Sequence, residues 1–274
     1  MPKILAGAFA LLMAATACRS DGVELAYRFP AQDSLVYEMV ADAEANWDIA
    51  GEGSGSYTVV FEVTETIESV DEEGAVVEVT MKPTDVQEEG GFIAPATADR
   101  TFKLQVGPHG EVRDVIEVDG IPASELDPDQ RLFIGTYRPL LPLDPVGLDD
   151  EWPGSQEFQG EEFQRITTLG TLEALNSDED GDYAELSYSG KGPLVWQTSL
   201  PEGQAELTGA ARITGSAELD LEDGFLRSAT SSTEGDFDVN VVPEEAGNPI
   251  AGTLHLELDL QLENLQRKAA EEET

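Results

Sequence analysis

The sequence predicts an all-β protein: one curved antiparallel sheet, in the form of a half-barrel, an open barrel or a sandwich, built from two similar halves. Apolar and polar residues alternate strictly along many segments of the chain, which is the pattern of strands with one dry face and one wet face. Such half-buried strands are typical of antiparallel sheets. Turn residues separate the segments in an order that occurs twice, and no long helical period interrupts them.

The start of the chain has the features of an export signal. Lys3 is the only charged residue before Arg19, and residues 4–15 are almost purely apolar. A positive residue followed by an apolar run of roughly 7–15 residues is typical of a signal peptide. The run is too short for a transmembrane helix, which needs about 20 apolar residues.

Cys18 is the predicted lipidation site. Small residues at positions 15–17 lead directly into it, and this arrangement resembles the bacterial lipobox, in which the cysteine receives the lipid and becomes the new N-terminus. It is also the only cysteine of the chain, so it has no partner for an internal disulfide. We predict a lipoprotein signal peptide at 1–17 and a lipidated tether at 18–22; the alternative is an ordinary secretory signal cleaved just before the cysteine.

Acidic residues dominate the composition. The 274 residues include 56 Asp and Glu but only 15 Lys and Arg, which gives a net charge of −41. Such a surface repels nucleic acid phosphates and anionic lipid headgroups, so we expect no nucleic acid partner and a membrane attachment through the lipid alone. The acidity is typical either of a high-salt habitat or of an ordinary acidic envelope protein. We expect a location in the cell envelope, on the outer membrane if the cell has two, because Arg19 is not an inner-membrane retention signal.

Residues 23–120 are predicted to form the first β half and residues 149–265 the second. Alternating segments include 57–63 and 102–106 in the first half and 237–241 in the second. The longest alternation carries leucine at every dry position. These candidate residues of an apolar lining are Leu254, Leu256, Leu258, Leu260 and Leu262.

The order of the turns indicates an internal duplication. A strand, an acidic turn ending at Gly74 and a second strand recur around Gly181, and the hairpin that turns at Gly110 recurs around Gly224. The two glycines are 36 residues apart in the first half and 43 in the second. We therefore predict that the two pairs of hairpins superpose.

Residues 121–148 form a different segment, and residues 266–274 a charged C-terminal tail. We predict a short helix starting near Ser124, followed by a linker whose prolines prevent a long helix. Its apolar residues are expected to cover a sheet face or to line the mouth of a cavity. They include Leu132, Phe133, Ile134, Tyr137, Leu140 and Leu141.

No residue pattern predicts catalysis. His109 lies in a turn and His255 on the wet face of a strand, so we expect both to be solvated, and neither HExxH nor a nucleophile elbow occurs. We therefore expect no enzyme, no catalytic residue and no cofactor. For at least two of the three tryptophans, Trp47, Trp152 and Trp196, we prefer core packing to a sugar-binding surface.

The acidic run 178–182 allows two interpretations. Oxygen ligands at alternate positions suit Ca²⁺, but the glycine is the fourth residue of the run rather than the sixth, and position 12 is Ser189 rather than glutamate. An acidic hairpin turn is the better interpretation, so we expect no metal site.

Three short segments resemble a family of uncharacterised bacterial lipoproteins and secreted proteins, defined as a domain of unknown function. They are residues 27–30 (Tyr-Arg-Phe-Pro) with Tyr37 after them, the hairpin 106–112, and the stretch 142–152 that ends in Asp-Glu-Trp. The resemblance implies a curved antiparallel β fold and supplies no catalytic residues. More loosely, the chain is similar to half-barrel envelope carriers of lipids and lipoproteins, which hold acyl chains on an apolar face.

Two functions remain open at this point. The first is a non-enzymatic binding module that holds an apolar small molecule or a lipid against the dry face. The second is a structural or protein-interaction lipoprotein, with an unidentified partner, whose dry face is only a core. A ligand cavity and a packed core give the same alternation of residues.

Overall fold

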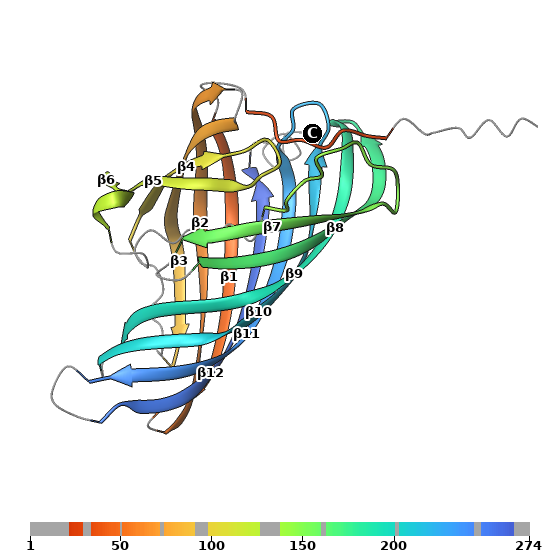
Figure 1. Ribbon diagram of the computed structural model, residues 1–274. Helices are drawn as coiled ribbons and strands as arrows, with labels where there is room; N and C mark the ends of the chain where they lie inside the picture. Colours follow the sequence, from red (N-terminus) through yellow and green to blue (C-terminus); the bar gives the residue numbers. More distant parts are fainter. Residues whose placement is uncertain are drawn as a thin grey trace, which may run out of the picture.

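One antiparallel sheet of twelve strands forms the protein (Figure 1). The computed structural model describes residues 22–29, 34–49, 51–71, 74–90, 98–126, 138–159, 163–200, 203–243 and 248–265. The strands are β1 Ser34–Asp48, β2 Glu52–Asp71, β3 Gly74–Glu89, β4 Arg100–Val106, β5 Val112–Val118, β6 Ile121–Pro122, β7 Glu151–Gln159, β8 Phe163–Asp178, β9 Gly181–Leu200, β10 Gly203–Asp220, β11 Leu226–Val242 and β12 Ile250–Asn264.

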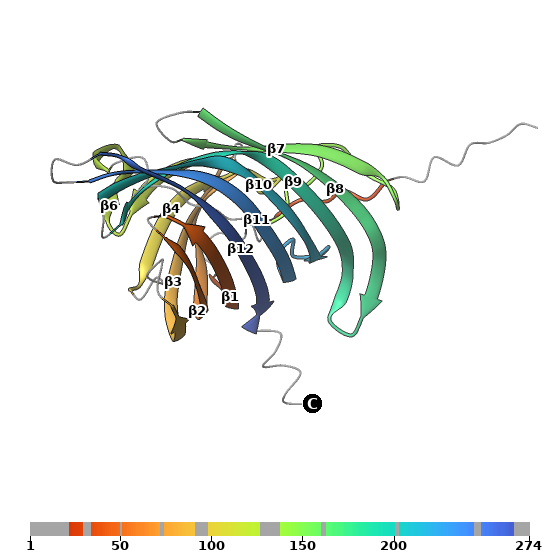
Figure 2. The ribbon, with the colours of Figure 1, turned by 90° about the horizontal axis from the view of Figure 1, so that it is seen from below.

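The strand order is β6-β5-β4-β3-β2-β1-β12-β11-β10-β9-β8-β7. The first and last strands therefore pair in the middle of the sheet, and the two edges come from the centre of the sequence. The sheet curves strongly, with β1–β3 on one side and β8 and β9 on the other (Figure 2), but its edges are not joined by backbone pairing. The prediction of a curved antiparallel all-β sheet is confirmed.

Only the start of the predicted helix lies within the described residues. Within the described residues, the 3-10 turn Ala123–Glu125, directly after β6, is the only helical turn of the segment between the halves. Pro139, Pro142 and Pro145 then keep the chain irregular. Leu132, Phe133, Ile134 and Tyr137 lie outside the described residues.

The strands of the two halves follow one another across the sheet in the same order. Reading along the sheet, β6 to β1 is followed by β12 to β7, so a shift of six strands relates each half to the other. This places the turns at Gly74, Gly110, Gly181 and Gly224 at one end of the sheet. The duplication itself stays a prediction, which a superposition of the two halves tests.

Two equivalent hairpins share a β-bulge. Arg113 is an extra residue near the start of β5, and Arg227 is an extra residue near the start of β11. Each lies three positions after its turn glycine, Gly110 or Gly224. A bulge changes the direction of the side chain that it carries. Arg113 pairs with Glu111, whereas Arg227 pairs with Asp178 and Asp220.

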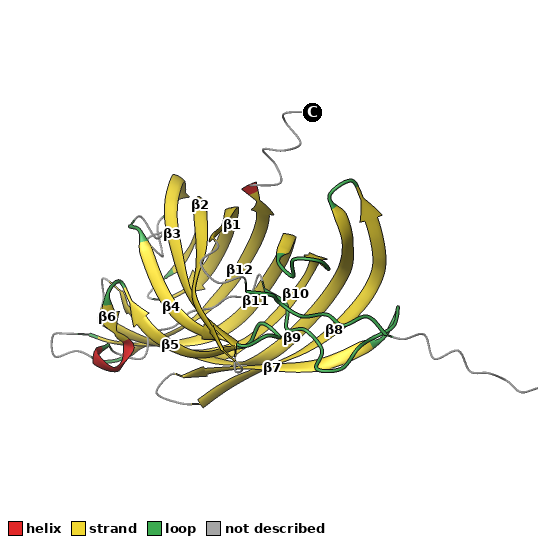
Figure 3. Cartoon of the chain, turned by 90° about the horizontal axis from the view of Figure 1, so that it is seen from above, coloured by secondary structure: helices red, strands yellow, loops and turns green. Residues whose placement is uncertain are grey.

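Two irregular segments cross the dry face at this same end (Figure 3). We call residues 22–29 and 138–150 the straps, and the end of the sheet that they cover the strapped end. The straps pair through Val23 and Val146, whose backbones exchange hydrogen bonds of 2.8 and 3.0 Å. Tyr27 N–H donates to the carbonyl of Pro108 in the first half, and Arg28 N–H to that of Gly224 in the second. Consecutive strap residues thus join the equivalent turns of both halves.

Aromatic rings lie against glycines on neighbouring strands. Trp47 faces Gly53 across β1 and β2, and Trp152 faces Gly170 across β7 and β8. A Cβ at either glycine would lie within 2.6 Å of the indole ring, so only glycine allows this contact. Trp152 is 5% exposed and Trp47 is half-buried, as the core interpretation predicts; the side chain of Trp196 lies outside the described part of the chain.

Candidate functional site on the dry face

The five predicted leucines lie on one face of β12, between β1 and β11. Leu262 and Leu260 belong to the hydrophobic cluster of the strapped end, and Leu254 belongs to a second cluster at the opposite, far end of the sheet. Leu256 and Leu258, between them, are only half-buried. These five leucines, which we call the leucine stripe, are therefore evenly spaced in the sequence but pack in two separate clusters.

The strapped-end cluster is a packed core. Leu25 and Tyr27 of one strap and Leu141 and Val146 of the other are buried in the same cluster as Leu262. Leu141 also donates its N–H to the carbonyl of the β4–β5 turn at 2.9 Å. The linker thus covers this part of the dry face, as the sequence predicts.

A buried ion pair fixes one strap to the sheet. Glu65 occupies a dry-face position of β2 and is 4% exposed, and it accepts a hydrogen bond from the guanidinium of Arg138. The same guanidinium lies 5.3 Å from the ring centroid of Tyr27, whose hydroxyl donates to the carbonyl of Pro139 at 3.0 Å. Two charges removed from water require such partners, so the strap and the sheet depend on each other here.

Arg227 forms the second buried charge network. It donates to Asp220 at 3.0 and 2.7 Å and to both carboxylate oxygens of Asp178 at 3.1 Å. Burial alone lowers the pKa of this guanidinium, but the hydrogen bonds and charges of the two aspartates more than reverse the effect, so its pKa is raised. The network joins the β8–β9 turn to the β10–β11 turn.

The acidic run 178–182 is accordingly a turn held by an arginine. The carboxylate of Asp178 and the carbonyl of Asp180 both accept from Arg227, so a guanidinium lies where a bound cation would be expected. Among the residues that the structure describes, no three His, Cys, Asp or Glu side chains gather as metal ligands would.

One side chain links the two edge regions of the sheet. Gln156 of β7 accepts from the N–H of Val112 at 3.2 Å and donates to the carbonyl of Val112 at 2.9 Å. Its amide therefore takes the place of a strand partner for β5. Nothing in the sequence pattern around Gln156 indicated this contact.

One row of residues across the dry face consists mostly of small side chains. One cross-strand row through Leu256 consists otherwise of glycine and alanine, because its partners on β1 and β11 are Ala45 and Gly235. The row continues on both sides with Gly55, Ala211 and Gly192. Small neighbours leave the leucine side chains without full cover, which explains why Leu256 and Leu258 stay half-buried.

A polar atom lies beside this row. Thr233 of β11 is the direct partner of Leu258, and its hydroxyl oxygen is buried with no hydrogen-bond partner in the described structure. Burying a hydroxyl without a partner costs free energy. Tyr57 lies opposite Ala43 on the same face, and burial raises the pKa of its phenol.

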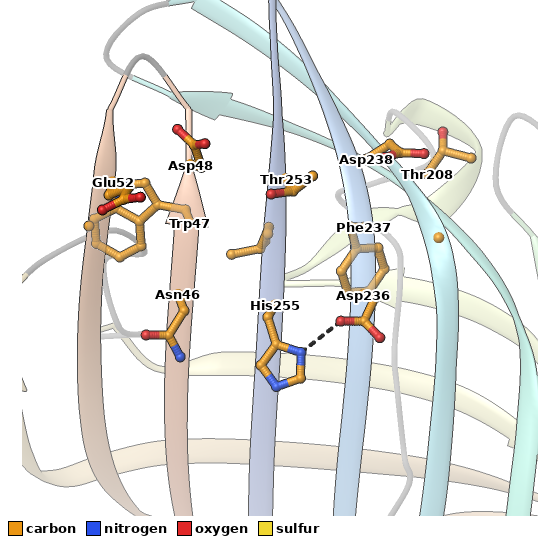
Figure 4. Close-up of a pocket in the computed structure, with 13 residues that line it drawn as sticks. Asn46, Trp47, Asp48, Glu52, Thr208, Asp236, Phe237, Asp238, Thr253 and His255 are labelled. Carbon is orange, nitrogen blue, oxygen red and sulfur yellow. Dashed lines mark hydrogen bonds and ion pairs between the residues drawn. The ribbon is translucent and has the colours of Figure 1, made fainter.

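The wet face is hollowed at the far end (Figure 4). This open hollow of about 620 Å³ is lined by polar residues of β1, β2, β10, β11 and β12 and also by Trp47, Phe237 and Leu254. His255 bridges Asp236 and Glu257 there at 2.8 and 3.1 Å. The hydrogen bond to Asp236 is the largest cause of its raised pKa, followed by that to Glu257.

Neither histidine is as solvated as the sequence analysis predicts. The side chain of His255 is 31% exposed because its two acidic partners hold it against the sheet. His109 is half-buried in the β4–β5 turn, and its Nδ1 is buried because the strap covers this turn.

Comparisons with known proteins give no assignment. No protein-family model, no curated protein and no solved structure matches the chain. The resemblance to a domain of unknown function therefore rests on the three segments named above. Within the described residues, no helix has the length and apolar character needed to span a membrane.

Proposed function

We propose that the protein is a non-enzymatic, membrane-anchored envelope lipoprotein that binds an apolar ligand such as a lipid on the dry face of its sheet. The anchor is the lipid on Cys18, and its expected place is the outer membrane if the cell has two. The observation that carries the ligand proposal is the partial exposure of Leu256 and Leu258 in the middle of an otherwise buried apolar face. Apolar surface of this kind is favourable to cover.

The surroundings of these leucines favour a chain-like ligand. The row of glycines and alanines crosses several strands at right angles to the leucine stripe. Phe237 covers this row at Gly235, whereas Gly55 and Leu256 are only half-buried and offer contact to a narrow apolar group. The buried hydroxyl of Thr233 supplies a polar group beside Leu258, which agrees with sites that are mostly apolar and hold a few polar groups.

A structural or protein-interaction role is the second candidate. Leu262 and Leu254, at the two ends of the stripe, are 1% and 2% exposed. Most of the dry face is thus already covered by protein, which favours a core without a ligand. The partner in such a role is unidentified.

Mass spectrometry of protein purified from its own membranes tests the proposal. Under denaturing conditions we expect the mass of the chain from residue 18 plus the covalent lipid, and under native conditions a further mass that organic extraction removes. A native mass equal to the denatured mass favours the structural role. Cys18→Ser is the control for the anchor: we expect it to leave the detergent phase, and unchanged partitioning would contradict lipidation.

A further inference from the structure

Two leucines of one strap are strongly exposed at the strapped end. Leu143 is 83% exposed and Leu148 is 55% exposed. Single exposed leucines are ordinary on protein surfaces, so exposure alone assigns nothing. Their position close to the N-terminal end of the described chain indicates what they contact.

Leu143 lies next to the point where the lipidated terminus reaches the folded protein. Gly22 packs so closely on this strap that a Cβ there would lie 2.8 Å from the carbonyl carbon of Pro145, and Val23 pairs with Val146. Cys18 is only four residues before Gly22. Because an extended chain spans at most about 3.6 Å per residue, Cys18 lies within about 14 Å of Gly22.

We infer that Leu143 and Leu148 are a membrane-contacting surface, which rests on the headgroups of the membrane that holds the lipid of Cys18. The inference rests on the lipidation contained in the proposed function. The headgroup layer on each side of a bilayer is about 5–8 Å deep, and the short tether keeps Leu143 within reach of it. The strapped end then faces the membrane.

The charges around this surface specify the kind of membrane. Asp144, Asp149 and Asp150 flank the two leucines and are exposed, and the whole chain has a net charge of −41. Anionic headgroups repel such a surface. The surface therefore fits a zwitterionic headgroup, such as phosphatidylethanolamine.

Spin labels on the lipidated full-length protein test this orientation. Leu143→Cys places a label on the proposed surface, and Val242→Cys is the matched control, because Val242 is 52% exposed at the far end of β11. The sulfur of Cys18 is blocked by its lipid, so each variant takes one label. The protein is reconstituted into vesicles of phosphatidylethanolamine and phosphatidylcholine, and collisions of the label with oxygen and with a water-soluble nickel complex are compared.

We expect the label at position 143 to lose nickel collisions several-fold relative to the label at 242, and to regain part of them when phosphatidylglycerol replaces the zwitterionic lipid. Equal nickel access at both positions in protein whose mass shows the lipid would overturn this inference and leave the proposed lipidation intact. An unmodified Cys18 in the mass spectrum would overturn both.

Discussion

The strapped end and the far end of the sheet use the same strands in different ways. At the strapped end, the dry face is covered by two straps and carries the buried charge of Glu65, and the turns of this end hold the buried guanidinium of Arg227. At the far end, the charged groups of the same strands lie on the wet face, as at His255 and Asp236, and are partly exposed. Leu256, in the row of small residues, packs against the far-end cluster, and Leu258 packs against the strapped-end cluster.

The difference shows how one open sheet combines a strapped core with a less covered middle region, which we propose as the ligand site. The straps are held by buried contacts: Arg138 pairs with Glu65 of β2, and the backbone of Tyr27 bonds the β4–β5 turn. The far end has an apolar cluster of its own around Phe237 and Leu254, and none of its described residues forms an ion pair as buried as that of Arg227. Changes at the strapped end should therefore act on stability more than on binding.

The largest expected effect is at Arg227. Arg227→Met leaves Asp220, whose side chain is 6% exposed, without its cation, and breaking a buried pair costs about 3–5 kcal/mol. We expect a loss of this size in the free energy of unfolding, measured by urea denaturation.

The equivalent hairpin provides the matched control. Arg113→Met removes an arginine at the same position after the turn glycine, but the side chain of Arg113 is 40% exposed beside Glu111. An exposed pair contributes about 0–1 kcal/mol. Equal losses for the two variants would contradict the contrast between buried and exposed bulge arginines.

A smaller effect is expected at the link between β5 and β7. Gln156→Ala removes both hydrogen bonds to Val112, which together contribute about 1–2 kcal/mol to the free energy of unfolding. Gln156→Glu should lose a similar amount, because its carboxylate accepts from the N–H of Val112 but repels the carbonyl.

Amide hydrogen exchange locates this effect in the structure. The exchange of the Val112 N–H should accelerate in both Gln156 variants, whereas Gln261→Ala, on the wet face of β12, should leave it unchanged. Unchanged exchange at Val112 in Gln156→Ala would show that the edges are held by other contacts.

The smallest expected effect is the pH dependence of the far end. Asp236 and Glu257 raise the pKa of His255 above its usual 6.5, so the protonated ring favours the folded state. This contribution is fully present below pH 6.5, the pKa in the unfolded chain, and is lost as the pH rises through the higher folded pKa.

An NMR titration of the His255 ring checks the direction of the shift. We expect a midpoint above 6.5, and we expect His255→Gln to remove the matching decrease in stability. A midpoint at or below 6.5 would contradict the bridge between the two acidic residues.

Strand positions and faces were predictable because they depend on a local period of two. The alternation at 254–262 correctly placed the leucines inward and His255 outward. The pairing of β1 with β12 was not predictable, because partners far apart in sequence leave no trace in a local period. For the same reason the sequence did not show which leucines meet the straps and which meet glycine and alanine.

The sequence contains a partial signal for the two buried charges, Glu65 and Arg227. Glu65 stands between Val63 and Ile67 at a dry position of β2, and an acid on the dry face requires a buried partner. Its partner Arg138 belongs to an irregular segment and has no pattern of its own. Arg227 repeats the spacing of Arg113 from the turn glycine, but their different burial depends on Asp178, which another hairpin supplies.

The most direct test of the central claim compares Leu258→Asn with Leu262→Asn, by urea denaturation and by the lipid mass retained in native mass spectrometry. Leu262 is 1% exposed in the strapped-end core, so its replacement should cost about 2–5 kcal/mol. Leu258 is half-buried opposite the unpartnered hydroxyl of Thr233, where an amide finds a hydrogen-bond partner, so we expect a loss below about 1 kcal/mol together with the loss of most of the bound lipid. Equal destabilisation by the two variants, with no lipid mass in the wild type, would show that the whole stripe is core and would contradict a ligand face in the middle of the sheet.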